Sequence, residues 1–171
     1  DIIFGKINPS GKLPYTYPRH NGVIMHYDHK QSELINANTW KNDFFNPQYE
    51  FGFGLSYTNY EYSNLKISKN VFSPLDKTIT VSVDVKNTGG KAGKEVVQLY
   101  SRDHFASISP PLKKLVRYAK INLDPNEIKT VSFTLGIKEL GFYNADNVWV
   151  NEPGKHSFFI NNLEDSFVIT N

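Results

Sequence analysis

The chain has 171 residues, of which 39% are hydrophobic and 14% aromatic, and it contains no cysteine. Without thiols it can form neither a disulfide framework nor a thiolate zinc site. Its formal net charge is +2, and its 19 basic and 17 acidic side chains are interspersed rather than clustered. Nucleic-acid-binding proteins concentrate Lys and Arg on one face, and a bilayer-spanning helix needs roughly 20 apolar residues in a row. We therefore expect neither a nucleic-acid partner nor a membrane segment.

The first 20 residues do not have the pattern of a domain. Asp1–Phe4 is expected to be the last turn of a helix, ended by Gly5 in the left-handed conformation. Lys12–Tyr17 is expected to be a short strand, and Pro14 restricts it to an edge or a strand start. A helix end and one strand have no core of their own, so this segment must pack on something else. The chain also opens mid-pattern without Met, and we interpret it as a piece of a longer or processed protein.

Residues 21–47 are polar and only weakly periodic, which indicates a long loop or connecting arm. The next stretch, Gln48–Ile67, is rich in aromatic residues and has two glycines one residue apart, Gly52 and Gly54. Paired glycines let a backbone turn tightly or pass close to a neighbour. We expect a pinched aromatic segment that leads into the first strand.

From Tyr60 onward the pattern is that of β-strands. Ile79, Val81, Val83 and Val85 alternate with polar residues, as in a sheet with one face in water. The expected strands are Tyr60–Ile67, Thr78–Lys86, Glu95–Tyr100, Lys114–Leu123, Thr130–Leu135, Leu140–Tyr143, Val148–Val150, His156–Ile160 and Phe167–Thr170. Short strands with turn signals every 8–12 residues are typical of an all-β, immunoglobulin-like or fibronectin type III-like antiparallel β-sandwich.

Five short motifs also occur along the chain in a fixed order. They are Asn8–Pro14 followed by Tyr17 and Pro18; Phe51–Thr58; Val85–Gly89 with Gly93–Tyr100; Ser109, Pro110, Lys113 and Leu115 with Leu123–Pro125 and Glu127; and Glu152–Gly154. In this order they resemble the C-terminal region of glycoside hydrolase family 3 enzymes. The resemblance covers nearly the whole chain. Each motif alone is weak, whereas five in the correct order are specific.

The resemblance implies a domain organisation. Residues 1–20 correspond to the end of the family's α/β sandwich catalytic domain, residues 21–55 to a connecting arm with an inter-domain plug, and residues 56–171 to a fibronectin type III-like β-sandwich. The sequence departs from the family pattern at three positions: Glu50 stands where Pro is common, and Arg117 and Asn126 stand where Gly is frequent. Asn tolerates the left-handed conformation, so we expect the turn at Asn126 to survive.

The aromatic stretch is interpreted as an inter-domain plug rather than a catalytic loop. The residues expected to pack between the modules are Tyr49, Phe51, Gly52, Phe53, Gly54, Leu55 and Tyr57. Burying such a cluster supplies several kcal/mol at roughly 25 cal/mol per Å². The alternative is a plain hydrophobic lead-in to the first strand.

Retaining glycoside hydrolysis needs two carboxyl groups about 5–5.5 Å apart. The resemblance places the nucleophilic Asp on a barrel and the acid/base on the following domain, both upstream of Asp1. No motif of this chain matches either one. We therefore expect no catalytic residue, no metal and no cofactor here, and no hydrolysis by the chain alone. The implied partners are the upstream catalytic domains and, through the parent enzyme, an oligo- or aryl-β-glycoside.

The stretch His26–Lys30 is the most suggestive local cluster of polar side chains. Two His and one Asp are possible metal ligands, but no further ligand follows at a recognisable spacing. The resemblance instead places the stretch on the arm, where His29 and Lys30 are candidates for the substrate rim; a plain solvated loop remains the alternative. Trp40, also on the arm, is a candidate for a distal sugar subsite.

Two features have simpler interpretations. Trp149 is expected in the core or in a hairpin pair. The basic run Lys113, Lys114, Arg117 and Lys120 is expected on the wet face of a strand, where it guards an edge.

The sequence is compatible with three functions. The first is the domain-bracing C-terminal region of a glycosidase that cleaves terminal β-glycosidic bonds, β-glucosides in the first place. The others are an independent carbohydrate-binding sandwich and a structural fibronectin-like module. Neither of these two explains residues 1–20, so the first is preferred, with a bacterial periplasmic or secreted location.

Overall fold

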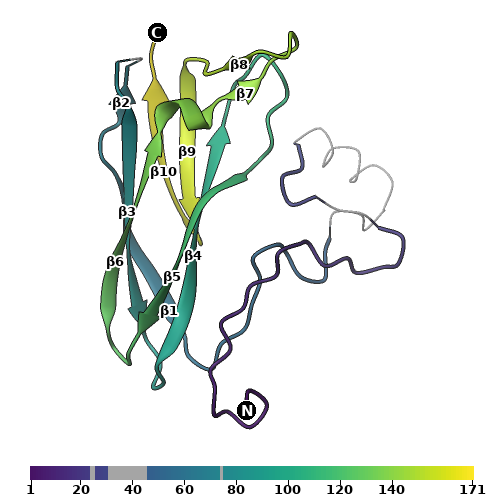
Figure 1. Ribbon diagram of the computed structural model, residues 1–171, viewed down its shortest axis with the longest axis vertical. Helices are drawn as coiled ribbons and strands as arrows, with labels where there is room; N and C mark the ends of the chain where they lie inside the picture. Colours follow the sequence, from purple (N-terminus) through teal and green to yellow (C-terminus); the bar gives the residue numbers. More distant parts are fainter. Residues whose placement is uncertain (24–25, 31–45, 74) are drawn as a thin grey trace.

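The computed structural model describes residues 1–23, 26–30, 46–73 and 75–171. Within this part of the chain, the large sheets form a β-sandwich (Figure 1). The first sheet has the order β1 (Tyr60–Ile67), β3 (Thr78–Asn87), β6 (Ile128–Gly136). The second has the order β2 (Val71–Phe72), β10 (Leu163–Ile169), β9 (Gly154–Ile160), β4 (Gly93–Asp103), β5 (Lys114–Leu123). β2 runs parallel to β10, and the other neighbours are antiparallel. The expected all-β, fibronectin-like sandwich is confirmed.

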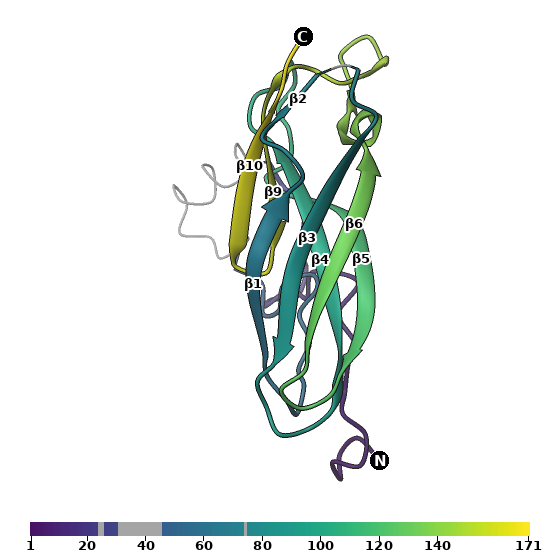
Figure 2. The ribbon, with the colours of Figure 1, turned by 90° about the vertical axis from the view of Figure 1, so that its left-hand side faces the viewer.

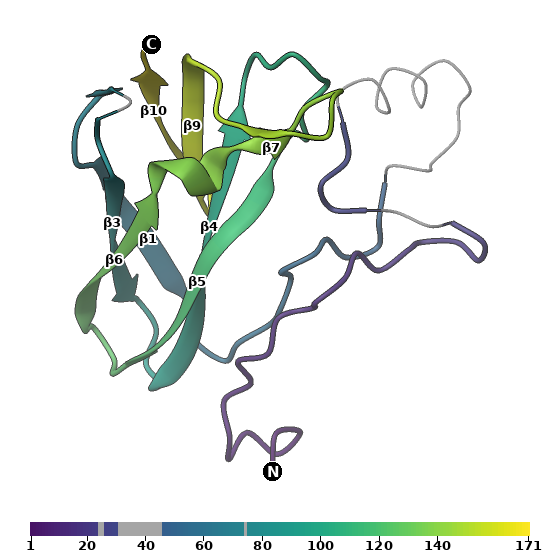
Figure 3. The ribbon, with the colours of Figure 1, turned by 45° about the horizontal axis from the view of Figure 1, so that its top comes forward.

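The core lies between the two sheets, which face each other in Figure 3. Along β3 the predicted inward residues Ile79, Val81, Val83 and Val85 are fully buried. Strict alternation places every second side chain on the inner face, so β3 and β6 together present an apolar surface. The facing sheet adds Val97, Leu99, Phe158, Ile160, Phe167 and Ile169.

The predicted strands match the structure at most places. β10 begins at Leu163, four residues before the start of the predicted strand Phe167–Thr170. Leu140 does not begin a strand, because Ile137–Leu140 forms a short 3-10 helix, and the following hairpin is reduced to β7 (Phe142–Tyr143) and β8 (Trp149–Val150). β2 was not predicted, since two residues carry too little periodicity to signal a strand. Lys12–Tyr17 is not an edge strand of either large sheet; it lies beside the arm instead.

Residues 1–6 form one helical turn that ends at Gly5, as predicted. The Lys6 N–H donates to the Asp1 carbonyl at 3.0 Å and the Gly5 N–H to the Ile2 carbonyl at 2.9 Å. Gly5 has a φ of +71°. This pair of hydrogen bonds around a left-handed residue is the Schellman motif that closes helices. Asn126 likewise adopts a φ of +64°, so the predicted turn before β6 is present.

The two ends of the chain lie at opposite ends of the molecule. Figures 1 and 2 show the N-terminus beyond the end where β1 begins and the C-terminus at the other end, after β10. The N-terminal segment and the part of the arm that leads into β1 run side by side outside the sandwich. This pairing creates the site described next.

Candidate functional site

The N-terminal segment and the end of the arm form a short antiparallel ribbon. The Leu13 N–H donates to the Phe53 carbonyl at 2.8 Å, and the Gly52 N–H donates back to Leu13 at 2.9 Å. Farther along, the Tyr17 N–H donates to the Tyr49 carbonyl at 2.8 Å. Backbone groups that would otherwise be left unpaired are thus satisfied without either large sheet. The ribbon makes one structural unit of residues separated by 32 positions (Tyr17 and Tyr49) to 40 positions (Leu13 and Phe53).

Gly54 permits the close approach of the two segments at one end of this ribbon, beside the Leu13–Phe53 pair. A Cβ atom at this position would collide with the Gly11 carbonyl oxygen and the Lys12 side chain. Gly52 has a φ of +80°, and a Cβ there would collide with the Gln98 side chain on β4. Both predicted uses of the paired glycines, a tight turn and a close approach, occur in this stretch.

Asn8 fastens the ribbon to the sandwich. Its side-chain oxygen accepts hydrogen bonds from the Ser56 hydroxyl at 2.9 Å and the Tyr57 N–H at 2.8 Å. Its amide group donates to the Ala92 carbonyl, in the turn between β3 and β4, at 3.1 Å. One side chain therefore joins the N-terminal segment, the end of the arm and the sandwich.

A second asparagine, Asn87 at the end of β3, holds together Thr58, the turn between β3 and β4, and the end of β5. It is fully buried and accepts a hydrogen bond from the Thr58 hydroxyl at 2.6 Å. Its amide group donates to the carbonyls of Lys91 at 2.8 Å and Leu123 at 3.2 Å. Buried polar groups satisfied in this way make a rigid junction, so the residues that follow the arm have a fixed position.

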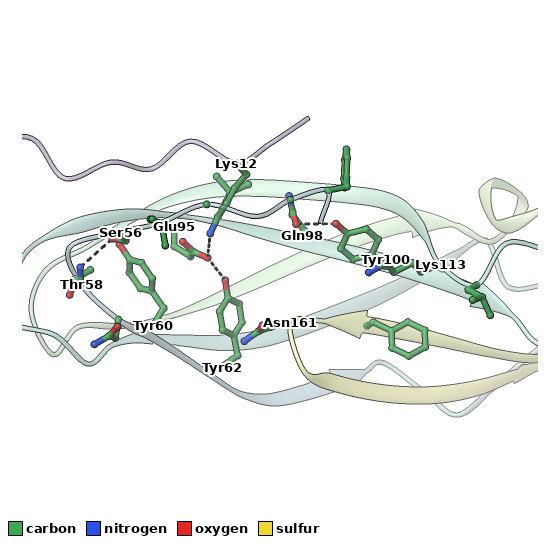
Figure 4. A pocket seen from close by; sticks show the side chains of 18 of the residues that line it. Lys12, Ser56, Thr58, Tyr60, Tyr62, Glu95, Gln98, Tyr100, Lys113 and Asn161 are labelled. Carbon is green, nitrogen blue, oxygen red and sulfur yellow. Dashed lines mark hydrogen bonds and ion pairs between the residues drawn. The ribbon is translucent and has the colours of Figure 1, made fainter. Parts of the chain in front are cut away.

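An ion pair completes the attachment (Figure 4). The Lys12 ammonium lies 3.1 Å from Glu95 Oε1, and their side chains are only 19% and 9% exposed. The Tyr62 hydroxyl donates to the same oxygen at 2.9 Å. Burial and the Glu95 charge both raise the pKa of Tyr62, which keeps its proton on the hydroxyl as donor. A charge from the N-terminal segment is therefore neutralised inside the sandwich.

The arm's earlier part contacts the sandwich through Tyr27. Its ring stacks on Phe51 with ring centres 4.2 Å apart, and its hydroxyl accepts a hydrogen bond from the Leu115 N–H at 3.4 Å. The His29 carbonyl accepts from the Leu112 N–H at 3.0 Å, and Lys30 pairs with Pro111 in an isolated β-bridge. The structure thus places His29 and Lys30 against the segment that leads into β5.

The remaining candidates on the arm have different positions. Trp40 lies outside the described residues. Among the described residues, no group of three or more possible metal ligands occurs together. The same part of the chain contains no helix of the length and apolarity needed to cross a bilayer.

The expected plug residues are only partly covered within this chain. Tyr49 and Phe53 stack on each other, with ring centres 4.7 Å apart, yet both keep about two fifths of their surface exposed. Leu55 is 73% exposed and Tyr57 46%. Only the inner side of the plug therefore rests on this chain, and its outer side faces away.

Apolar side chains near the N-terminus continue this exposed surface. Ile3 and Phe4 are 89% and 83% exposed, and Ile2 and Ile7 about half. The Tyr57 hydroxyl donates to the Ile2 carbonyl at 2.9 Å, which brings the helix end and the plug together. We call Ile2, Ile3, Phe4, Ile7, Leu55 and Tyr57 the apolar N-terminal surface.

Two further predictions concern surface residues. Trp149 is paired with Tyr143 across the β7–β8 hairpin, so the hairpin interpretation is confirmed and the core one is wrong. Along the basic run, Arg117 contacts Glu139 at 2.5 Å, and Lys113 lies 3.6 Å from Glu50 on the arm. Lys113 thus also joins the sandwich to the arm, a role that its position in a basic run did not indicate.

Asn8, Lys12 and Glu95 were not predicted as partners. All three lie within motifs that sequence comparison singles out, but a motif does not show which residue of another motif it contacts. For Glu95, the sequence did contain one indication that it has a charged partner. It occupies an inward position of an alternating strand, where a charge requires a counterion.

Two protein-family models match parts of this chain. Residues 1–57 match the model of the glycosyl hydrolase family 3 C-terminal domain, and residues 95–163 match that of the fibronectin type III-like domain. The chain belongs to glycoside hydrolase family 3. The family resemblance inferred from the motifs is thereby confirmed.

Family 3 relatives align with nearly the whole chain. A periplasmic β-glucosidase of Salmonella typhimurium is 40% identical over 94% of this chain, and a β-xylosidase of Formosa agariphila is 42% identical over 90% of it. This chain covers 22% and 21% of these two proteins, so it spans less than a quarter of their length.

Solved structures give the same result. A β-glucosidase from Erythrobacter marinus superimposes with a TM-score of 0.90 at 35% identity, covering 99% of this chain and 23% of that one. A β-glucosidase from Listeria innocua in complex with glucose gives a TM-score of 0.83 at 32% identity, covering 96% and 25%. The fold of this chain is therefore the same as the fold of about a quarter of each of these two enzymes.

Proposed function

We propose that this chain is the domain-bracing accessory region of a glycosidase that hydrolyses terminal β-glycosidic bonds, β-glucosides in the first place. Residues 1–20 belong to the end of the α/β sandwich catalytic domain, residues 21–55 to the connecting arm and plug, and residues 56–171 to the accessory β-sandwich. The β-glucosidases among the relatives support the activity, and the β-xylosidases make xyloside the second candidate substrate.

The observation that carries the proposal is that the N-terminal segment is bound to this chain on one side and exposes apolar side chains on the other. One side is fixed to the arm and the sandwich through Asn8, Lys12 and the ribbon. The other side consists of the apolar N-terminal surface. A group of exposed apolar side chains of this kind is typical of an interaction site, and the preceding catalytic domain of the same enzyme is the partner that fits it.

The brace acts on catalysis through position. In the proposed parent enzyme the two reacting carboxyl groups lie upstream, and they must stay about 5–5.5 Å apart for a retaining reaction. A misplacement of 1 Å at a catalytic centre can cost about 100-fold in rate. Fixing the end of the α/β domain to a rigid sandwich limits such movement. Tyr49, Phe51, Gly52, Phe53, Gly54, Leu55 and Tyr57 have this packing role.

The arm has a second role in this proposal. His29 and Lys30 are held against residues 111 and 112, and with Trp40 they are the proposed substrate rim of the parent enzyme. The proposed location is the bacterial periplasm or the extracellular space, which the periplasmic relative supports.

Hydrolysis of a chromogenic β-glucoside tests the proposal, with the matching β-xyloside in parallel. The longer enzyme is expected to turn over one of them, and this chain at high concentration neither. Turnover by the purified chain would place catalytic carboxylates within it and overturn the accessory role. Failure of the longer enzyme on both substrates would overturn the proposed activity.

A further inference from the structure

A groove of about 800 Å³ lies between the arm and the sandwich. The arm from Phe51 to Ser56 forms one wall, and β1 and β4 form the other. Figure 4 shows Tyr62 and Asn161 on one side of this space and Gln98 and Tyr100 on another. Its volume falls within the roughly 300–1,000 Å³ typical of small-molecule sites.

Several polar groups in the groove have unused hydrogen-bonding capacity. The Arg102 guanidinium has no hydrogen-bond or ion-pair partner among the described residues. Gln98 accepts a hydrogen bond from the Tyr100 hydroxyl at 3.0 Å, which leaves its amide group as a donor. The Tyr60 hydroxyl is buried without a partner in the described part of the chain. Because the Tyr60 hydroxyl is covered, Arg102 and the Gln98 amide group are the donors that a polar ligand in the groove would meet.

Aromatic rings accompany these polar groups. Tyr62, Tyr100, Phe51 and Phe159 all line the groove. Tyr rings offer an apolar face together with a polar edge. A ligand that fits must therefore combine flat apolar faces with many hydroxyl donors and acceptors.

The charges indicate a neutral ligand. Lys12 is paired with Glu95 at 3.1 Å, and Lys113 with Glu50 at 3.6 Å. Among the described residues that line the groove, Arg102 is the cation without an ion-pair partner, and its planar guanidinium can donate two hydrogen bonds side by side. The paired carboxylate of Glu95 also disfavours an anion in the same space.

We propose that this groove binds a short neutral saccharide of one or two pyranose rings. Separate hydroxyls of the saccharide receive hydrogen bonds from Arg102 and Gln98, which lie four residues apart on β4, while the C–H face of the sugar rests on the aromatic wall. Binding is a property of the chain itself, so it goes beyond the proposed bracing role and does not depend on hydrolysis by the parent enzyme.

Titration of the isotopically labelled 171-residue chain with cellobiose, followed by amide NMR shifts, tests the proposal. We expect saturable shifts at β4 residues 96–102 and at residues 51–56, and sorbitol at equal concentration is expected to give none. Arg102→Ala and Gln98→Ala should each weaken binding roughly two- to tenfold, the value of one net hydrogen bond. Lys94→Ala, an exposed change on the same strand, is the matched control and should bind as the unchanged chain does.

Absence of saturable shifts, equal shifts with sorbitol, or full affinity in both variants would overturn the proposal. Shifts confined to the exposed Tyr143–Trp149 hairpin would overturn it as well. If Arg102→Ala fails to fold, Arg102→Lys replaces it, because this change keeps the charge and removes the planar pair of donors. A chain that binds no saccharide leaves the hydrolysis test of the longer enzyme unaffected.

Discussion

Replacing Lys12 by Met removes the charge that compensates Glu95 inside the sandwich. At 3.1 Å the attraction of the pair amounts to about 5 kcal/mol for an effective dielectric constant of about 20. Desolvation of both charges offsets much of this, yet removing one partner of a buried pair still costs about 3–5 kcal/mol. The Lys12 side chain keeps 19% of its surface in water, which reduces the effect. We expect Lys12→Met to weaken the attachment of the N-terminal segment by about 2 kcal/mol.

Native-state hydrogen exchange measures this attachment directly. The Leu13 and Gly52 amides are bonded across the ribbon and should exchange roughly 30-fold faster in Lys12→Met. Lys12→Met combined with Glu95→Gln should lose clearly less than the sum of the two single changes, because neither charge is then left alone. Lys6→Met, an exposed change on the same segment, is the control and should stay within about 0.5 kcal/mol. Strict additivity of the two single changes would refute the reasoning.

Three further changes test other parts of the structure. Gly54→Ala should lower the stability of the ribbon by about 1–3 kcal/mol, since the methyl group has no space, whereas Gly11→Ala, which meets no atom within 4 Å, should be nearly neutral in thermal unfolding. Asn87→Ala should cost about 2–3 kcal/mol in urea unfolding, because it leaves buried partners unpaired; a loss no larger than that of the exposed Asn122→Ala would contradict this. Burial lowers the pKa of His156 below its usual value of about 6.5. The unfolded chain therefore takes up a proton at a higher pH than the folded one, and the free energy of unfolding should fall as pH drops from 7.5 to 5.5. His156→Phe should reduce that slope, and an unchanged slope would show that another group is responsible.

The strand pattern was predictable because it depends on local alternation. Tyr60–Ile67 and Lys114–Leu123 begin and end where the sequence indicated. The inward residues of β3 follow from a period of two, which only a strand satisfies. Errors occurred where a local pattern was short or ambiguous, as at Leu140, whose apolar side chain suits a 3-10 turn as well as a strand.

The site was less predictable because it consists of contacts between distant segments. The sequence indicated that the stretch around Gly52 and Gly54 is pinched, and the structure supplies the neighbours, Gln98 and the Gly11 carbonyl. Nothing local in Lys12 indicates a partner 83 positions away. Side-chain contacts across such separations are determined by how whole elements pack.

Side-chain footprinting of the apolar N-terminal surface tests the central claim most directly. Labelling of Ile3, Phe4 and Leu55 would be compared between this chain alone and the proposed longer family 3 enzyme, with the exposed Tyr118 on β5 as the reference. We expect strong protection of the three side chains in the longer enzyme and unchanged labelling of Tyr118. Equal labelling of Ile3, Phe4 and Leu55 in both proteins would contradict the claim that this region braces a preceding domain.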